Sequence, residues 1–84
     1  MDTEKYQITI HLDTPRDVME FCQITGTYPM HTNITAQHDI YTVSARSILG
    51  MYSLNLSEPI KVIFETNKLL NTEKIQEDFK KFVV

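Results

Sequence analysis

The sequence predicts an α+β domain in which helices cover one face of an antiparallel β-sheet, with the element order β-α-β-β-α-β-α. Two patterns predict this fold class. Short segments alternate apolar and polar residues, as half-buried strands do, and apolar residues recur at helical spacing between and after these segments. The chain has 84 residues, which is room for one hydrophobic core, so we expect residues 1–84 to form a single domain.

The first strand and the first helix are expected in residues 5–26. Residues 5–12 alternate between apolar and polar side chains, which predicts a half-buried strand. Asp13, Thr14 and Pro15 then predict a helix start, because they supply an N-cap followed by proline in the first turn. Gly26 predicts the end of this helix. The apolar stripe between these ends consists of Val18, Phe21, Cys22 and Thr25.

A hairpin and a short helix are expected next. Residues 32–36 and 41–45 favour strands, and residues 37–40 between them predict a hairpin turn, although the turn contains no glycine. Ser47 stands directly before residues 48–52, which suit a short helix that begins with serine as its N-cap.

The last strand and the last helix complete the order. Residues 60–65 alternate once more, which predicts a strand after a loop. Asn71 or Thr72 is expected to cap the final helix, in which Glu77 and Lys81 have the spacing of an i, i+4 ion pair. The predicted apolar stripe of this helix consists of Ile75, Phe79, Phe82 and Val83.

Composition and charge exclude several classes of protein. Eleven acidic residues against eight basic ones give a net charge of −3, which argues against nucleic-acid binding because that function needs a basic face. The apolar runs are too short for a membrane-spanning helix, so we expect no membrane insertion. The acidic start of the chain argues against a secretory signal and favours a cytoplasmic location.

Few residues offer catalytic chemistry. The histidines His11, His31 and His38 lie far apart in the sequence, and a zinc site needs three or four convergent ligands, so we expect neither a metal nor a cofactor. The single cysteine, Cys22, lies on the apolar stripe of a helix and is expected to be a core residue rather than a nucleophile. We therefore expect a protein that is not an enzyme.

Ser47 is the most informative single residue. Its position at a helix start is typical of a plain N-cap. If it were phosphorylated instead, the phosphate would lie against free helical N–H groups, with Arg46 adjacent in the sequence. The residues alone favour the plain cap.

The segment from residue 43 to residue 54 resembles the region around the regulatory serine of HPr, the histidine-containing phosphocarrier of the bacterial phosphoenolpyruvate-dependent sugar phosphotransferase system. The matching residues are Arg46, Ser47, Ile48, Leu49, Gly50, Ser53 and Leu54. Residues 59–65 are similar to the last strand of that family, so the resemblance covers residues 40–65. It implies an HPr-like open-faced β-sandwich, a four-stranded antiparallel sheet with three helices on one face. It also implies that Ser47 stands at the regulatory phosphorylation position.

One departure from the family bears on function. HPr carries its phosphorylated histidine where the first strand meets the first helix, but the matching residues 12–17 contain none, and Arg16 falls on or beside that position. A guanidinium stays protonated and is a poor nucleophile, so Arg16 can bind a phosphate but is not expected to carry one. The sequence is similar in this respect to catabolite-repression HPr-like proteins, which lack the histidine and keep the serine.

These observations predict a binding or regulatory module that lacks histidine phosphocarrier activity. Its expected partners are proteins of the phosphotransferase or carbon-regulation type, and it is expected to be a monomer or weak dimer. Arg16 and Arg46 are candidate contacts for phosphate or a partner. Met51 and Leu54 are either core residues or part of a docking surface. Two alternatives stay open: a working phosphocarrier that uses His11 or another histidine, and an unrelated α+β interaction domain.

Overall fold

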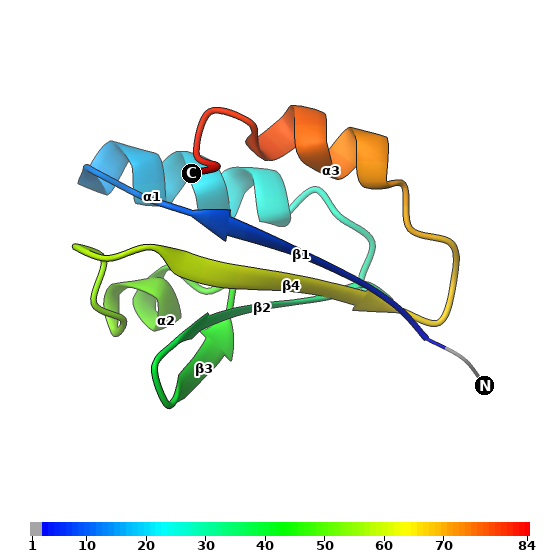
Figure 1. The fold of residues 1–84 in the computed structure, drawn as a ribbon, viewed down its shortest axis with the longest axis horizontal. Helices are drawn as coiled ribbons and strands as arrows, with labels where there is room; N and C mark the ends of the chain where they lie inside the picture. Colours follow the sequence, from blue (N-terminus) through cyan, green and yellow to red (C-terminus); the bar gives the residue numbers. More distant parts are fainter. Residues whose placement is uncertain (1–2) are drawn as a thin grey trace.

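The computed structural model describes residues 3–84 and has the predicted order of elements (Figure 1). The elements are β1 (Glu4–Ile10), α1 (Pro15–Thr25), β2 (Asn33–His38), β3 (Tyr41–Ser44), α2 (Ile48–Tyr52), β4 (Ile60–Thr66) and α3 (Thr72–Phe79). The four strands form one antiparallel sheet with the spatial order β1-β4-β2-β3. The fold is thus the expected HPr-like open-faced β-sandwich.

The hydrophobic core lies between the inner face of the sheet and the helices. Alternation along the strands turns one set of side chains inward, and the buried members of this set are Ile8, Ile10, Ile34, Ala36, Ile60, Val62, Phe64 and Thr66. The helices contribute Val18, Phe21, Met51, Ile75 and Phe79 to the same cluster. The Phe79 ring lies 5.4 Å from that of Phe21 and 5.5 Å from that of Phe64, measured between centroids. Aromatic packing therefore joins α3 to both α1 and the sheet.

The hairpin between β2 and β3 shows how the chain turns without glycine. His38 and Tyr41 are paired, so only Asp39 and Ile40 form the turn. Asp39 has a φ of 58°, in the left-handed region that glycine usually occupies. Aspartate tolerates this conformation better than most residues do. The strand β2 consequently continues to His38, two residues beyond its predicted end.

Local capping explains where α1 and α3 begin. Thr14 Oγ accepts a hydrogen bond from the Asp17 N–H at 3.1 Å, and the Asp17 carboxylate accepts one from the Asp13 N–H at 3.0 Å. This reciprocal arrangement satisfies two backbone donors at the helix start. In α3 the cap is Asn71, whose side chain accepts from the Lys74 N–H at 3.0 Å.

The predicted ion pair between Glu77 and Lys81 is wrong. Helix α3 ends at Phe79, so the following residues do not continue the helical spacing. Glu77 pairs instead with Lys80 at 3.0 Å, and Lys81 reaches across to Glu20 on α1. The helix-to-helix pair joins residues far apart in the sequence, which a local spacing rule cannot anticipate.

The last residues of the chain extend the sheet. Val83 forms an antiparallel bridge with Ile10, at the outer edge of β1. The His11 N–H donates to the Phe82 carbonyl at 2.9 Å, and the Val84 N–H donates to the Thr9 carbonyl at 3.0 Å. Part of one sheet edge is thereby covered by the C-terminal residues.

Candidate protein-docking surface at α1 and α2

Ser47 caps the short helix α2, as the sequence predicts. Its side chain is exposed and accepts a hydrogen bond from the Gly50 N–H at 3.0 Å, and its carbonyl accepts one from the Met51 N–H at 2.9 Å. Gly50 is needed at this place, because an added Cβ would lie 3.2 Å from Ser47 Oγ and 3.3 Å from Val43 Cβ. The glycine therefore lets the capping side chain approach the helix closely.

The exposed apolar residues of α2 differ from those that the sequence proposed for docking. Met51 is fully buried and Leu54 is only 6% exposed, so both belong to the core and cannot form a docking surface. Met51 of α2 and Leu54 after it lie in the core, whereas Leu49 of α2 faces outward and is 81% exposed. We name the exposed apolar residues of α2 the α2 patch; it consists of Ile48, Leu49 and Tyr52.

A shallow groove lies between the start of α1 and the end of α2. Its lining combines polar backbone-capping residues with apolar side chains: Leu12, Asp13, Thr14, Pro15, Val18, Tyr52, Leu56 and Ser57. Tyr52 belongs to both the groove and the α2 patch, so the two features are continuous. Together they form a surface with apolar and polar parts of the kind that proteins use to contact one another.

Arg46 has a structural role that the sequence did not predict. Its Nη1 donates to the carbonyl oxygens of Thr25 and Tyr28, and its Nη2 to those of Pro29 and Thr32, over distances of 2.8–3.0 Å. The planar guanidinium thus ties the connection before α2 to the loop after α1. Both Nη atoms are engaged with carbonyls, so a contact of Arg46 with phosphate or a partner would compete with these bonds, and that contact stays a prediction.

Arg16 lies in the first turn of α1 and is exposed. Within residues 3–84 its side chain makes no hydrogen bond or ion pair. Its position is compatible with the contact that the sequence predicts, and that contact stays a prediction.

The three histidines do not converge. His11 Nδ1 lies 2.7 Å from an Asp13 carboxylate oxygen, and its side chain is 31% exposed. His38 contacts Glu58, and His31 is exposed on the connection before β2. No group of three or more histidine, cysteine, aspartate or glutamate side chains in the described part of the chain is arranged to hold a metal ion.

Cys22 is a core residue, as predicted. Its side chain is buried, and its Sγ lies 3.9 Å from the Ala45 carbonyl oxygen. Burial raises the pKa of the thiol, which disfavours the nucleophilic thiolate.

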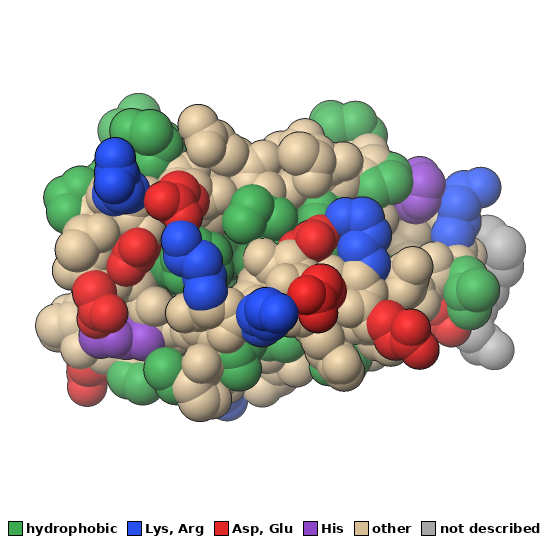
Figure 2. Space-filling view, turned by 90° about the horizontal axis from the view of Figure 1, so that it is seen from above, with side chains coloured by type: hydrophobic (Ala, Val, Ile, Leu, Met, Phe, Trp, Pro, Cys, Tyr) green, Lys and Arg blue, Asp and Glu red, His purple; other side chains and the backbone are tan. Residues whose placement is uncertain are grey.

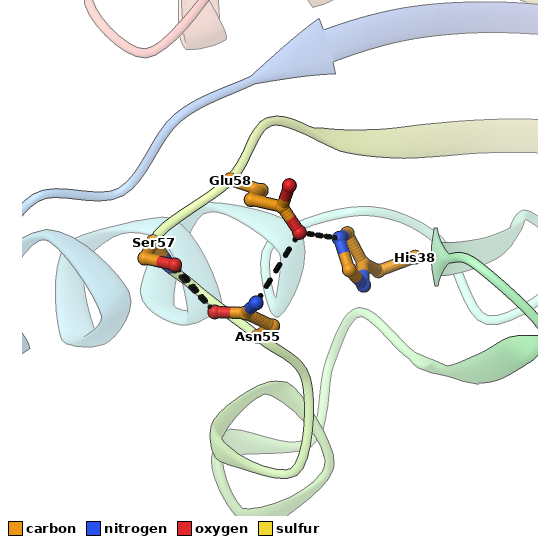
Figure 3. A network of polar contacts seen from close by, with 4 residues as sticks. All are labelled: His38, Asn55, Ser57 and Glu58. Atoms are coloured by element: carbon orange, nitrogen blue, oxygen red, sulfur yellow. Dashed lines mark hydrogen bonds and ion pairs between the residues drawn. The ribbon is translucent and has the colours of Figure 1, made fainter.

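A polar network that the sequence does not predict lies beside this surface (Figure 3). His38 Nε2 lies 2.9 Å from Glu58 Oε1, and the Asn55 amide donates to the same oxygen at 3.2 Å. The Ser57 hydroxyl donates to Asn55 Oδ1 at 2.6 Å. These contacts join the β2–β3 hairpin to the loop that borders the groove. Only the pairing within residues 55–58 has a sequence signal, because asparagine and serine in a loop are typical of local side-chain turns.

The surface over α1 and α3 has a different character. Figure 2 shows acidic and basic side chains interspersed there, without a large area of one sign. The pairs Lys74–Asp78, Glu77–Lys80 and Glu20–Lys81 account for much of this pattern. No helix in residues 3–84 is long and apolar enough to cross a membrane.

Comparison with family models finds no match, and comparison with curated proteins finds none either.

Proposed function

We propose that the protein is an HPr-like binding module of the bacterial sugar phosphotransferase system, cytoplasmic and regulatory, without histidine phosphocarrier activity. The observation that supports this proposal best is the place of Ser47 in the fold. It is exposed at the start of α2, next to the α2 patch, and it lies in the segment that resembles the regulatory serine of HPr. A change in charge at Ser47 would act directly on the surface that is available for docking.

The physical effect of phosphorylation at Ser47 follows from its neighbours. A phosphate adds a charge of about −1.5 to −2 at neutral pH. Ile48 is 40% exposed and Leu49 is 81% exposed, so this charge would stand beside apolar contact area. A partner that buries Leu49 would have to desolvate the phosphate, whereas a partner with arginine residues would gain a charged contact. Phosphorylation would thus change which partners bind.

The absence of carrier activity follows from the residue at the start of α1. Phosphoryl transfer between proteins needs a nucleophilic ring nitrogen, which neutral imidazole supplies near pH 7. The resemblance puts Arg16 on or beside the phosphorylated position, and a guanidinium keeps its proton at any physiological pH.

The test is to treat the protein with an HPr serine kinase and ATP and to map the phosphate by mass spectrometry. We expect one phosphate on Ser47 and none on the Ser47→Ala variant. Authentic HPr in the same reaction serves as the positive control. If HPr is modified and Ser47 is not, the regulatory part of the proposal fails.

A working phosphocarrier that uses His11 is the second candidate. Its support is the contact between His11 Nδ1 and Asp13, because a carboxylate that orients an imidazole makes the opposite nitrogen a better nucleophile. Incubation with phosphoenolpyruvate and the phosphotransferase that acts upstream of HPr distinguishes the two. We expect no acid-labile phosphate on any histidine. Phosphate on His11 would overturn the proposal, and failure of both tests would favour an unrelated interaction domain.

A further inference from the structure

The outer edge of β1 presents backbone groups without partners. In an antiparallel pair, successive residues direct their N–H and C=O groups alternately toward one neighbour and the other. The bonds of Thr9 and His11 to the C-terminal residues show that the odd-numbered residues of β1 face outward. The even-numbered residues consequently face β4.

Lys5 and Gln7 therefore point their N–H and C=O groups away from the sheet. No backbone group within residues 3–84 pairs with them, whereas Val84 and Phe82 occupy the next two outward positions. A regular row of open donors and acceptors is a template for another strand. The pairing of residues 82–84 shows that this edge accepts an antiparallel strand.

The opposite edge of the sheet is a poorer template. Strand β3 is only four residues long, and the Ser44 carbonyl already accepts a bond from the Ser47 N–H at 3.2 Å. This leaves Thr42 as the one outward residue of β3 whose N–H and C=O are both without a backbone partner within residues 3–84, against two such residues in β1. A strand that joins the sheet would therefore join at β1.

We propose that β1 is a docking site for an extended segment of a partner protein, which adds an antiparallel strand in line with Val83 and Val84. The segment would pair with Gln7 and Lys5 through two of its own alternate residues, and neither of these could be proline. The Lys5 ammonium lies 3.8 Å from a Glu65 carboxylate oxygen, but the Lys5 side chain is 66% exposed, so an acidic residue opposite it would share the ammonium with Glu65. This inference does not depend on the function proposed for Ser47.

A second copy of the chain fits this edge less well. A symmetric pairing centred on Lys5 sets two lysines opposite each other, which is repulsive. A pairing centred on Gln7 needs the position beside Thr9 that Val84 occupies. A pairing centred on Tyr6 allows only the two Lys5–Gln7 pairs. Beyond these pairs, each strand reaches Thr9 of the other copy, whose outward position Val84 already occupies. A strand from a different protein has none of these conflicts.

A tethered strand tests the site first. Four residues, Val-Thr-Val-Glu, are appended after Val84, so that the threonine faces Gln7 and the glutamate faces Lys5. Backbone amide hydrogen exchange, followed by NMR, should slow at least tenfold at Lys5 and Gln7. The control carries proline in place of the appended threonine and glutamate, and its exchange should equal that of the parent chain. Equal exchange in both extended proteins would overturn the proposal.

The same segment is then supplied as a free, end-blocked peptide at millimolar concentration. We expect slowed exchange and chemical-shift changes at Lys5 and Gln7 of the parent chain, and no effect from a peptide N-methylated at the two pairing residues. Lys5→Glu should weaken peptide binding at least threefold, whereas Lys68→Glu, the same change of charge outside the strand β1, should not. A tethered strand that docks while the free peptide has no effect would rule out β1 as a site for a separate partner.

Discussion

Arg46 Nη1 donates a hydrogen bond of 2.8 Å to the carbonyl oxygen of Thr25, the last residue of α1. Arg46 lies just before α2, so this contact ties the end of one helix to the beginning of another. The same carbonyl accepts a hydrogen bond from the Tyr28 N–H at 3.2 Å, so the guanidinium adds a second bond at the end of the helix. The position of Ser47 relative to α1 therefore depends on the residue beside it.

Replacing Arg46 should destabilise the fold. A lysine ammonium cannot reach four carbonyl oxygens with a planar fork of donors, so Arg46→Lys leaves some of them without a partner. We expect a loss of about 1–3 kcal/mol in the free energy of unfolding, measured by urea denaturation. Arg16→Lys is the matched control and should change it by less than about 0.5 kcal/mol. Equal effects of the two changes would contradict the role of Arg46.

Ser47→Ala should cost about 0.5–2 kcal/mol of stability, because the Gly50 N–H loses its side-chain acceptor. Ser47→Asp retains a good N-cap acceptor and should unfold at nearly the same urea concentration as the natural protein. Measured together, the two variants show whether the loss of stability comes from the loss of the capping hydrogen bond. If both lose the same stability, the cap is not the reason for the loss.

Gly50→Ala should not give the stabilisation that alanine usually gives inside a helix. That gain is about 1 kcal/mol, but here the new Cβ would lie 3.2 Å from both Cβ and Oγ of Ser47. We expect a net loss of stability. In the Ser47→Gly background both contacts with Ser47 are absent and the contact with Val43 remains, so Gly50→Ala should cost less stability there than in the natural protein. Thermal unfolding of the four proteins in this cycle measures the coupling, and additive effects would contradict it.

Asp78 should make stability depend on pH in the acidic range. The Lys74 ammonium hydrogen-bonds the Asp78 carboxylate at 2.5 Å and the Tyr28 hydroxyl does so at 2.8 Å, and these bonds lower the pKa of Asp78. A carboxyl with a lower pKa in the folded protein stabilises it above the unfolded pKa of about 3.9, and this contribution is lost as the pH falls through the folded pKa.

The measurement compares the natural protein with Asp78→Asn. We expect the variant to be less stable by about 1 kcal/mol at pH 7, because the carboxylate is partly exposed and its ion pair is screened by solvent. The difference should shrink as the pH is lowered toward about 3. Glu73→Gln, in the first turn of the same helix, is the control and should show a smaller difference at every pH. A gap that stays constant with pH would contradict the assignment.

The same cluster affects Tyr28 in the opposite direction. Burial, aided by the hydrogen bond to the negative Asp78 carboxylate, raises the pKa of the Tyr28 hydroxyl above its usual value. The phenol therefore remains a donor to Asp78 throughout the neutral range. It adds to the contact between α3 and the loop after α1 without an ionisation of its own.

The order of elements and the starts of the helices could be predicted because they depend on nearby residues. The caps Thr14, Ser47 and Asn71 bond to N–H groups three residues away, and each is visible as a residue type at a fixed spacing. The alternation that predicts each strand is equally local. The hairpin predicted over residues 37–40 contains the observed turn at Asp39 and Ile40, where Asp39 adopts the left-handed conformation in place of a glycine.

The candidate site was predicted less completely. Ser47 lies where the sequence placed it, but Leu49 rather than Met51 is exposed. In a five-residue helix, apolar residues on several sides leave the buried side undetermined until the neighbouring elements are known. His38 and Glu58 come together only because a hairpin and a later loop meet in space.

The sequence by itself determined the local structure of this protein and the resemblance on which its proposed regulation rests. Periodicity and capping act within about four residues, so the residue types at neighbouring positions are enough to predict them. The tertiary structure decided which long side chains have partners and which surfaces are open. Arg46 became a bridge to α1, Lys81 paired with Glu20, and residues 82–84 covered only part of the β1 edge. These outcomes depend on contacts between residues that are distant in the chain. The packing of the helices against the sheet decides which of these residues come into contact.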